Sequence, residues 1–394
     1  MSDRRDNPNA DERRDTPAAD ERRDIDKKPT PAPSRDTPFT TADMPIGGRL
    51  VGFLDDDIAK QPTVLRTDGY DILVVKDLKM HFPVTKGLFK RVVGHVKAVD
   101  GVSFTIRQGE TLGIVGESGS GKSTVGNCVM RNLTPTAGQI LFDNRDVTNI
   151  KGKELGTFHK YLTMVTQDPF ASLDPRMRIE DSILEGVRIN RLVTDPHEQA
   201  DLVTRLLVLV GLNPKFAERY PHEFSGGQRQ RISIARALAL NPAFIVCDEI
   251  VSALDVSIQA QIVGLMMRLQ QQLGLTYIFI GHDLSVVRHI SNNVAVMYLG
   301  KFMELTSSDE LYEKPLHPYT QALISAAPIP KPRVDRQRQR ILLEGEVPSP
   351  INPPAGCNFC TRCRYADERC RTEEPALRDV GGGHMVACHR VAEG

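Results

Sequence analysis

The segment Gly-Glu-Ser-Gly-Ser-Gly-Lys-Ser-Thr (116–124) constrains the fold of this 394-residue chain more than any other feature. It follows the short apolar segment TLGIV (111–115), which is predicted to be a buried strand, and a helix is predicted to open at Lys122. Small residues let successive backbone N–H groups face an anion, and the helix that follows adds the positive end of its dipole. Lys-Ser-Thr between a strand and a helix therefore indicates a phosphate-binding loop on an α/β scaffold.

The phosphate loop predicts contacts with a nucleoside triphosphate and with a magnesium ion. We expect the Lys122 ammonium to reach the β- and γ-phosphates and the Ser123 hydroxyl to bind Mg²⁺. The predicted nucleotide-binding residues of the loop are Gly116, Glu117, Ser118, Gly119, Ser120, Gly121, Lys122, Ser123 and Thr124.

A second candidate element follows the apolar segment Phe-Ile-Val-Cys (244–247), which ends in Asp248 and Glu249. A carboxylate at the C-terminal end of a buried parallel strand emerges beside the phosphate loop. We therefore expect Asp248 to hold Mg²⁺ through water, and Glu249 to orient and deprotonate the water that attacks the γ-phosphate. Without the phosphate loop, the same pair would indicate only an acidic helix start after a core strand.

Composition limits the classes of partner. The chain has 50 Lys+Arg against 50 Asp+Glu and a sequence pI near 7.1, which argues against a nucleic-acid binder that works through a general basic field. No apolar run approaches the roughly 18 residues that a membrane-spanning helix needs. The first residues lack the apolar segment of a secretory signal. We therefore expect any membrane role to come through a partner.

Changes in composition along the chain predict its domains. Residues 1–70 are expected to form a disordered extension, because their first part is rich in charge and proline and repeats the triplet Arg-Arg-Asp. From 71 to 315, strand-like and helical segments alternate, which predicts a mostly parallel sheet covered by helices on both faces. A helical subdomain is expected at about 170–236. Proline and then cysteine are enriched in 316–394, which predicts a small C-terminal domain.

The segment Phe-Ser-Gly-Gly-Gln (224–228) completes the set of motifs. Taken alone, Ser-Gly-Gly before a helix is an ordinary turn and N-cap. Here it lies about a hundred residues after the phosphate loop and about twenty before Asp248. This order resembles that of the ATP-binding cassette (ABC) ATPases throughout residues 71–300. The resemblance implies an α/β fold of the P-loop NTPase class, specifically an ABC-type nucleotide-binding domain with a helical subdomain.

The resemblance also assigns further residues to the site. It implies that Gln167 contacts Mg²⁺ and the attacking water, and that His282 contacts the γ-phosphate. It implies that a second subunit completes each ATP site in trans, through the signature residues Ser225, Gly226, Gly227 and Gln228. The segment implied to cross the dimer interface, the D-loop, is Ser252, Ala253, Leu254 and Asp255. Phe89 and His95 are both open as candidates for stacking on adenine.

Longer segments resemble the F-type ATP-binding subunits of dipeptide and oligopeptide importers. They are VGHVKAVDGVSF (93–104), QDPFASLDPRM (167–177), HPYTQAL (317–323) and PSPINPPAGC (348–357). The resemblance implies ATP hydrolysis that drives peptide uptake, by a peripheral subunit on the cytoplasmic face of the cell membrane. Implied partners are a second, D-type ATPase subunit, two membrane permeases and an extracytoplasmic peptide-binding protein, with no nucleic acid. The alternatives are another cargo (nickel, a sugar or an antimicrobial peptide) and a soluble ABC ATPase acting on ribosomes or DNA.

Five of the seven cysteines lie between 357 and 388, which in a chain without an export signal points to a metal. Resemblance to importer C-terminal tails implies a [4Fe–4S] cluster held by Cys357, Cys363, Cys370 and Cys388. Cys360 is then an extra thiol, although spacing alone would match Cys357, Cys360 and Cys363 to bacterial ferredoxin ligands. A structural zinc site and unligated buried cysteines are the alternatives.

Overall fold

The computed structural model describes residues 70–87, 89, 91–168, 172–327 and 340–391. The predicted N-terminal extension therefore lies outside the described residues, apart from Tyr70 at its end. Among the described helices, none is both long and apolar enough to cross a membrane.

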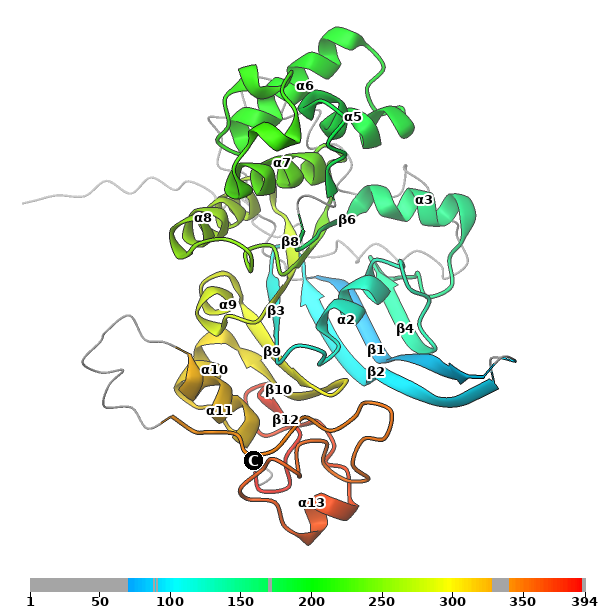
Figure 1. The fold of residues 1–394 in the computed structure, drawn as a ribbon, viewed down its shortest axis with the longest axis vertical. Coiled ribbons are helices and arrows are strands. Elements are labelled where there is room, and N and C mark those ends of the chain that lie inside the picture. Colours follow the sequence, from blue (N-terminus) through cyan, green and yellow to red (C-terminus); the bar gives the residue numbers. More distant parts are fainter. Residues whose placement is uncertain (1–69, 88, 90, 169–171, 328–339, 392–394) are drawn as a thin grey trace, which may run out of the picture.

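An eight-stranded sheet forms the centre of the fold (Figure 1). Its strands are β3 (Thr111–Val115), β6 (Leu162–Val165), β7 (Phe244–Asp248), β8 (Thr276–Gly281), β9 (Asn293–Tyr298), β10 (Lys301–Ser307), β11 (Arg378–Asp379) and β12 (Met385–Val386). They lie in the order β11-β12-β10-β9-β3-β8-β7-β6, and the five from β9 to β6 are parallel. The predicted mostly parallel sheet is confirmed, with an antiparallel edge formed by β10, β12 and β11.

Both faces of this sheet are buried, as the alternation of side chains along β8 shows. Successive side chains of a strand point to opposite faces. Tyr277 and Phe279 belong to one hydrophobic cluster, while Ile278 and Ile280 belong to another. A strand that is covered on both faces needs apolar residues at every position, which explains why the sequence TYIFI shows no polar alternation.

A second, antiparallel sheet lies beside the first, and the sequence pattern does not distinguish the two. Its strands are β1 (Asp71–Lys86), β2 (Arg91–Arg107), β4 (Ala137–Phe142) and β5 (Arg145–Asp146), in the order β2-β1-β4-β5. The strands β1 and β2 pair as a long antiparallel hairpin. Figure 1 shows this hairpin projecting from the body of the molecule.

Helices cover the central sheet and form a separate group above it in Figure 1. Those near the sheet are α2 (Lys122–Val129), α3 (Gly152–Tyr161), α8 (Val256–Leu273) and α9 (Leu284–Ile290). The helical group comprises α5 (Ile179–Ile189), α6 (Pro196–Leu209), η3 (Pro214–Phe216), η4 (Pro221–Glu223) and α7 (Gly226–Leu238). Helix α8 buries one face, which carries Ile262, Met266 and Leu269, and Gly274 ends the helix at φ 65°.

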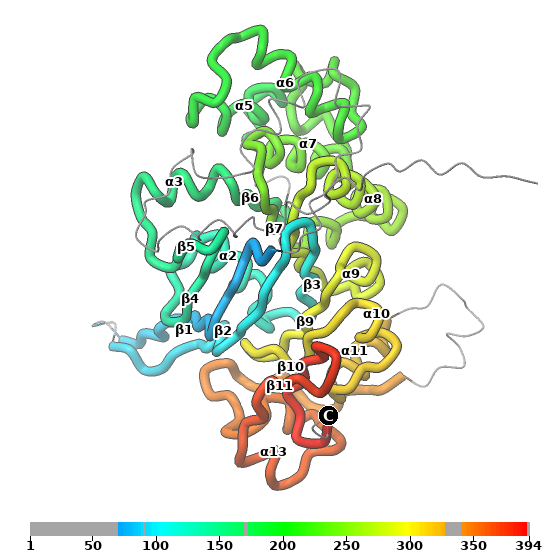
Figure 2. The backbone as a smooth tube through the Cα atoms, turned by 180° about the vertical axis from the view of Figure 1, so that it is seen from behind, coloured from blue at the N-terminus to red at the C-terminus, as the bar shows by residue number. Residues whose placement is uncertain are grey.

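The C-terminal region returns to the central sheet. Its helices are α10 (Ser308–Glu313), α11 (Pro318–Ala326) and α13 (Glu368–Thr372). Strand β12 pairs with β10, and both views show the region packed beside that edge (Figures 1 and 2). Beneath it lies the fully buried carboxylate of Glu304, which accepts hydrogen bonds from the backbone N–H groups of Leu316 and His317 at 2.8 and 2.9 Å. His384 Nε2 lies 2.7 Å from the same carboxylate.

Candidate active site

The phosphate loop connects β3 to α2 through a backbone that only glycine can adopt at two positions. Gly116 has φ 155° and Gly121 has φ 108°. A Cβ atom would lie 2.1 Å from the carbonyl oxygen of Met297 at the first position and 2.1 Å from that of Ala98 at the second. Glycine therefore lets the loop pack directly on β9 and β2, and α2 begins at Lys122 as predicted.

Lys122 is folded back over the loop. Its ammonium donates hydrogen bonds to the carbonyl oxygens of Gly116 and Glu117, at 3.0 and 2.9 Å. An ammonium has three protons to donate, so these bonds leave one for a phosphate oxygen. Burial lowers the pKa of Lys122, and the nearby carboxylates of Glu249, Asp248 and Glu117 act in the opposite direction.

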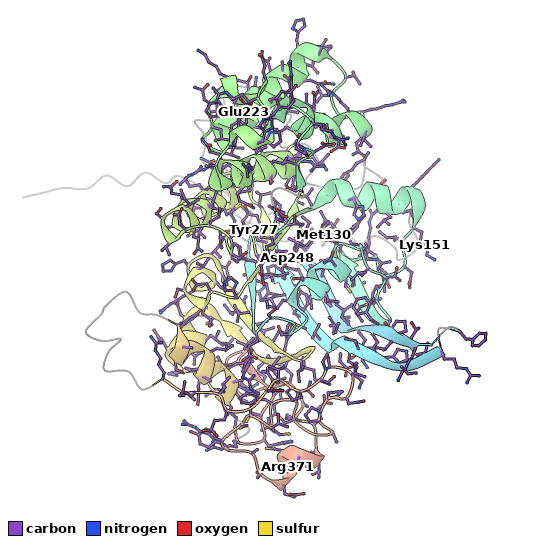
Figure 3. All side chains as sticks on the ribbon, viewed as in Figure 1. Met130, Lys151, Glu223, Asp248, Tyr277 and Arg371 are labelled. Carbon is purple, nitrogen blue, oxygen red and sulfur yellow. The ribbon has the colours of Figure 1, made fainter. Side chains whose placement is uncertain are left out.

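The loop and the end of β7 meet at the expected magnesium position. Ser123 Oγ donates a hydrogen bond to Asp248 Oδ1 at 2.9 Å, and Figure 3 places Asp248 near the middle of the molecule. Burial raises the pKa of Asp248 and the charge of Glu249 raises it further, while the Ser123 hydrogen bond and the charge of Lys122 lower it. A hydroxyl and a carboxylate are hard oxygen donors of the kind that Mg²⁺ prefers, so these two residues fit that ion.

Glu249 follows Asp248 in a strained conformation. Its φ is 49°, which costs a non-glycine residue about 1–3 kcal/mol. The backbone is fixed there because the Glu249 N–H donates to the Ile280 carbonyl at 3.0 Å and the Ser252 hydroxyl donates to the Glu249 carbonyl at 2.9 Å. The side chain is 20% exposed, and its Oε2 lies 4.0 Å from Nδ1 of His282. Two of the three predicted catalytic residues, Glu249 and His282, thus face each other at the ends of β7 and β8.

Gln167 reaches the same edge of the sheet from the end of β6. It is exposed, and its Nε2 donates a hydrogen bond to Ser252 Oγ at 3.2 Å. Of the remaining predicted D-loop residues, Ala253 and Asp255 are exposed and Leu254 is half-buried. Asp255 caps α8 by accepting from the Ile258 N–H at 3.0 Å. One chain therefore brings Gln167 and Ser252 to the edge that carries Glu249 and His282.

The signature residues lie elsewhere, at the start of α7 in the helical group. Ser225 is exposed and accepts from the Gln228 N–H at 3.3 Å, while the Gln228 side chain accepts from the Ser225 N–H at 3.0 Å. This reciprocal capping box fixes the helix start. Gly227 is needed for packing, since a Cβ would lie 2.5 Å from Ile258. Within the described part of the chain, no recorded contact joins the signature residues to the phosphate loop.

Two residues that the sequence analysis did not single out contact the phosphate loop. The Glu117 N–H donates to the Tyr319 hydroxyl oxygen at 2.9 Å. Arg362 Nη1 donates to both carboxylate oxygens of Glu117, at 3.0 and 2.8 Å. Tyr319 lies in the HPYTQAL segment, which was noted only for its resemblance, and Arg362 lies between two cysteines.

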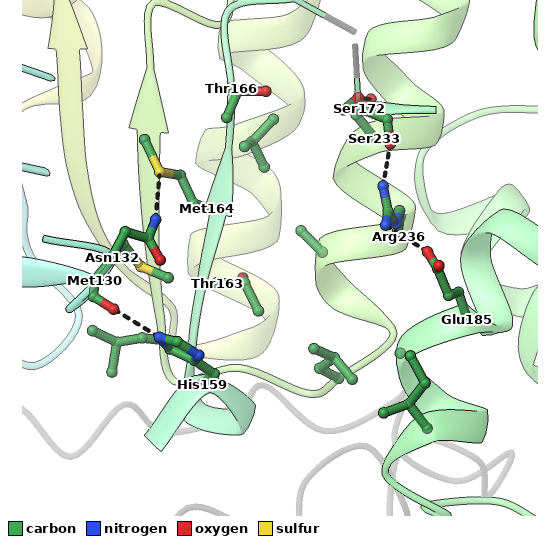
Figure 4. A pocket seen from close by; sticks show the side chains of 16 residues that line it. Met130, Asn132, His159, Thr163, Met164, Thr166, Ser172, Glu185, Ser233 and Arg236 are labelled. Atoms are coloured by element: carbon green, nitrogen blue, oxygen red, sulfur yellow. Dashed lines mark hydrogen bonds and ion pairs between the residues drawn. The ribbon is translucent and has the colours of Figure 1, made fainter. Parts of the chain in front are cut away.

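A pocket of about 420 Å³ opens between β6, α3, α5 and α7 (Figure 4). Thr166, which precedes Gln167, lines it, as do Glu185 and Arg236, whose side chains form an ion pair at 2.6 Å. Ile189 also lines the pocket and is 75% exposed. The pocket therefore lies between the helical group and the edge of the sheet where the candidate active site is found.

The predicted cluster cysteines approach one another without forming a recognisable metal site. The Cys357 N–H donates to the Cys370 carbonyl at 2.8 Å. Burial, together with smaller contributions from the nearby Cys360, Cys370 and Cys388, raises the pKa of the Cys357 thiol to about 12. Cys363 is likewise close to Cys388 and Cys360. Among the described residues, no group of three or more His, Cys, Asp or Glu side chains is arranged to hold a metal ion.

Phe89 and His95 lie on the β1–β2 hairpin, both exposed, and Phe89 is 88% exposed near its tip. No described contact favours either residue as the one that stacks on adenine.

Comparison with known proteins agrees with this geometry. Residues 99–252 match the family model described as ABC transporter, and residues 303–370 match that of the oligopeptide/dipeptide transporter, C-terminal region. The dimeric structure of the ATP-binding cassette MJ0796 in a post-hydrolysis state, bound to ADP and Pi, superposes with a TM-score of 0.53 at 26% identity. That superposition covers 60% of this chain and 98% of the other. The fold and the site thus define an ATP-binding cassette ATPase.

Relatives that match most of this chain identify its family within that class. The chain is 56% identical over 319 residues to the oligopeptide transport ATP-binding protein AppF of Bacillus subtilis (strain 168), covering 81% of this chain and 97% of AppF. It is 54% identical over 318 residues to the putative oligopeptide transport ATP-binding protein YkfD of the same organism, covering 81% and 95%. The chain belongs to the oligopeptide transport ATP-binding proteins of the ABC transporter family.

Proposed function

We propose that this chain is the ATP-binding subunit of an importer that couples ATP hydrolysis to the uptake of dipeptides and oligopeptides. The hydrogen bond between Ser123 and Asp248, with Glu249 directly beyond it, carries the ATPase part of the proposal. The names of the relatives, which are oligopeptide transport ATP-binding proteins, and the match at 303–370 support peptide as the cargo. Nickel, sugars and antimicrobial peptides are the alternative cargoes.

In the proposed site, the loop amides and Lys122 bind the triphosphate, and Ser123 and Asp248 hold the magnesium ion with Gln167. Bound Mg²⁺ would neutralise charge on the phosphate oxygens. Glu249 orients the attacking water and takes its proton, because its carboxylate stands at the edge of the sheet beside the loop. His282, whose Nδ1 lies 4.0 Å from the Glu249 carboxylate, contacts the γ-phosphate.

The site is completed in trans. Ser225 is exposed at a helix N-terminus, where backbone N–H groups and the helix dipole favour an anion. Val256, beside the D-loop, is 81% exposed, as an apolar residue at a subunit interface would be. We propose that a second, D-type ATPase subunit presents its own signature residues to this phosphate loop, and receives Ser225 and its neighbours in return.

The pocket beside β6 is the proposed docking site for a membrane permease. It combines an exposed apolar residue, Ile189, with the Glu185–Arg236 ion pair, and it adjoins Thr166 and hence Gln167. A permease segment inserted there would move with the helical group as the two ATPase subunits close. We propose that the chain acts at the cytoplasmic face of the membrane, with a second permease and an extracytoplasmic peptide-binding protein completing the importer.

The domain division and the metal remain part of the proposal. We propose an ATPase domain at 71–315, with its helical subdomain at about 170–236, and a C-terminal domain at 316–394 after the extension at 1–70. The sequence spacing of the cysteines, and not the arrangement of the described side chains, supports a [4Fe–4S] cluster in the C-terminal domain, with zinc as the alternative.

Purification from membranes tests the function. We expect the full chain to copurify with a second ATPase subunit and two permeases, and to support ATP-dependent uptake of labelled dipeptide or oligopeptide. Ile189→Asp should abolish the copurification of the permeases while ATP binding persists. Leu192→Asp, at a 44% exposed position close in sequence but outside the pocket lining, serves as its control. Recovery of the chain with ribosomes or DNA instead would favour the soluble-ATPase alternative.

A further inference from the structure

Glu117, the second residue of the phosphate loop, is held at three separate groups. Its N–H donates to the Tyr319 hydroxyl, its carbonyl oxygen accepts from Lys122 Nζ, and its carboxylate accepts from Arg362. Two of these three partners come from the C-terminal region, and Arg362 is 245 residues away in the sequence.

The groups behind these contacts form a rigid base. The rings of Tyr298, Tyr319 and Phe359 pack together with centroid separations of 4.8–5.4 Å. Arg362 lies against Tyr298 with its guanidinium 5.9 Å from the ring centroid. The Arg362 side chain is only 9% exposed, so its ion pair with Glu117 is not an ordinary surface pair.

The position of Glu117 matters for nucleotide binding in two ways. Its carbonyl fixes the Lys122 ammonium, so a displaced Glu117 peptide would displace that ammonium as well. Its carboxylate lies in the loop that receives a triphosphate, and an uncompensated negative charge there would repel the phosphates. Arg362 supplies the compensating charge at 2.8 Å.

We infer that Arg362 and Tyr319 are positioning residues for the phosphate loop, through which the C-terminal region sets the affinity of the ATPase domain for nucleotide. This inference rests on the proposed ATP site. Neither residue touches the nucleotide: Tyr319 fixes the Glu117 peptide, and Arg362 fixes and neutralises its side chain.

Equilibrium binding of the fluorescent analogue mant-ATP to the full chain tests the inference. We expect Arg362→Ala to weaken binding roughly tenfold, as loss of a hydrogen-bonded charge partner does. Tyr319→Phe, which keeps the ring and loses only the hydroxyl, should weaken it several-fold. Arg362→Lys should recover part of the loss. Arg371→Ala is the matched control, because Arg371 is exposed on α13 in the same region and Figure 3 places it far from Asp248.

A double-mutant cycle distinguishes an effect of Arg362 that acts through Glu117 from a general effect on the folding of the chain. If Arg362 acts through Glu117, the tenfold effect of Arg362→Ala should fall below about twofold in a Glu117→Ala background. In ATPase assays with the partner subunits, the loss should appear in KM more than in kcat. An equal loss in both backgrounds, or unchanged mant-ATP binding by Arg362→Ala and Tyr319→Phe, would overturn the inference. Lys122→Ala distinguishes a failure of this inference from a failure of the proposed ATP site. Normal mant-ATP binding by that variant would overturn the ATP site itself.

Discussion

Ser123 Oγ and Asp248 Oδ1 lie 2.9 Å apart, although 125 residues separate them in the chain. The contact joins the first turn of α2 to the end of β7, two positions that come together because β3, β8 and β7 are adjacent parallel strands. Oxygen donors from both motifs therefore face one point at the edge of the sheet.

Lys122→Ala should reduce nucleotide affinity. The variant loses the only ammonium described in the phosphate loop, and we expect mant-ATP binding to fall by about two orders of magnitude, as for loss of a charge-assisted contact to phosphate. Lys153→Ala, at an exposed position on α3, is the control and should bind normally. Unchanged affinity in Lys122→Ala would contradict the assignment of the loop.

Glu249→Gln should retain ATP and stop hydrolysis. The amide keeps the shape of the side chain but cannot take a proton from water, so we expect a rate lower by about 10²–10⁴-fold. With the partner ATPase and Mg²⁺–ATP, the variant should accumulate as a closed dimer, detectable by size-exclusion chromatography. Glu198→Gln on α6 is the control. Normal steady-state turnover by Glu249→Gln would refute the role of that carboxylate.

Asp248→Asn should stabilise the nucleotide-free protein and abolish magnesium-dependent hydrolysis. Burial raises the pKa of Asp248 above its ordinary value, so the charged form is disfavoured by folding at neutral pH. The asparagine removes this charge, and the melting temperature should therefore rise at pH 7. The difference should shrink as the pH falls through the raised pKa of Asp248, where the wild-type carboxyl becomes protonated. Thermal unfolding across this range checks the sign, and a lower melting temperature for Asp248→Asn at pH 7 would contradict it.

Ser225→Asp should separate the binding of nucleotide to this chain from its ATP-induced association with the partner subunit. Aspartate preserves the N-cap acceptor of α7, so the helix start should stay intact. Its negative charge would oppose the phosphates of the nucleotide bound to the partner subunit. We expect normal mant-ATP binding by the isolated chain and loss of ATP-induced association with the partner. Ser225→Asn, which caps without the charge, is the comparison, and equal association by both variants would argue against completion of the site in trans.

The proposed [4Fe–4S] cluster predicts opposite results for two of the cysteines, Cys388 and Cys360. An anaerobic preparation should be brown and contain iron and sulfide, whereas a colourless protein with zinc would favour the alternative. Cys388→Ser should lose the cluster, while Cys360→Ser should keep it. The reverse result would support the ferredoxin-like spacing of Cys357, Cys360 and Cys363.

Local sequence patterns predicted the elements that build the site. The apolar strand before the phosphate loop and the helix start at Lys122 both follow from short-range signals, namely a short apolar segment and the small residues of the loop that precedes the helix. The same patterns also predicted the position of the catalytic carboxylates. Asp248 ends a buried strand of the parallel sheet, and Glu249 follows it directly.

Long-range pairings could not be predicted in this way. Nothing in the sequence of β1 or β4 marks them as partners in a separate antiparallel sheet, because antiparallel neighbours are chosen by tertiary packing. The contact between Glu117 and Arg362 has no periodicity and no fixed spacing. A charged residue in a glycine-rich loop was the available signal, since a half-buried carboxylate needs a cation somewhere in the fold.

The buried carboxylate of Glu304 bears on any attempt to isolate the ATPase domain. All three hydrogen-bonding groups described at that carboxylate, the N–H groups of Leu316 and His317 and the ring of His384, lie beyond residue 315. Cutting the chain at 315 would strand an anion in the apolar interior and uncover the strand edge of β10. Such a fragment should self-associate in solution, so enzymology on a shortened cassette would report on a damaged molecule.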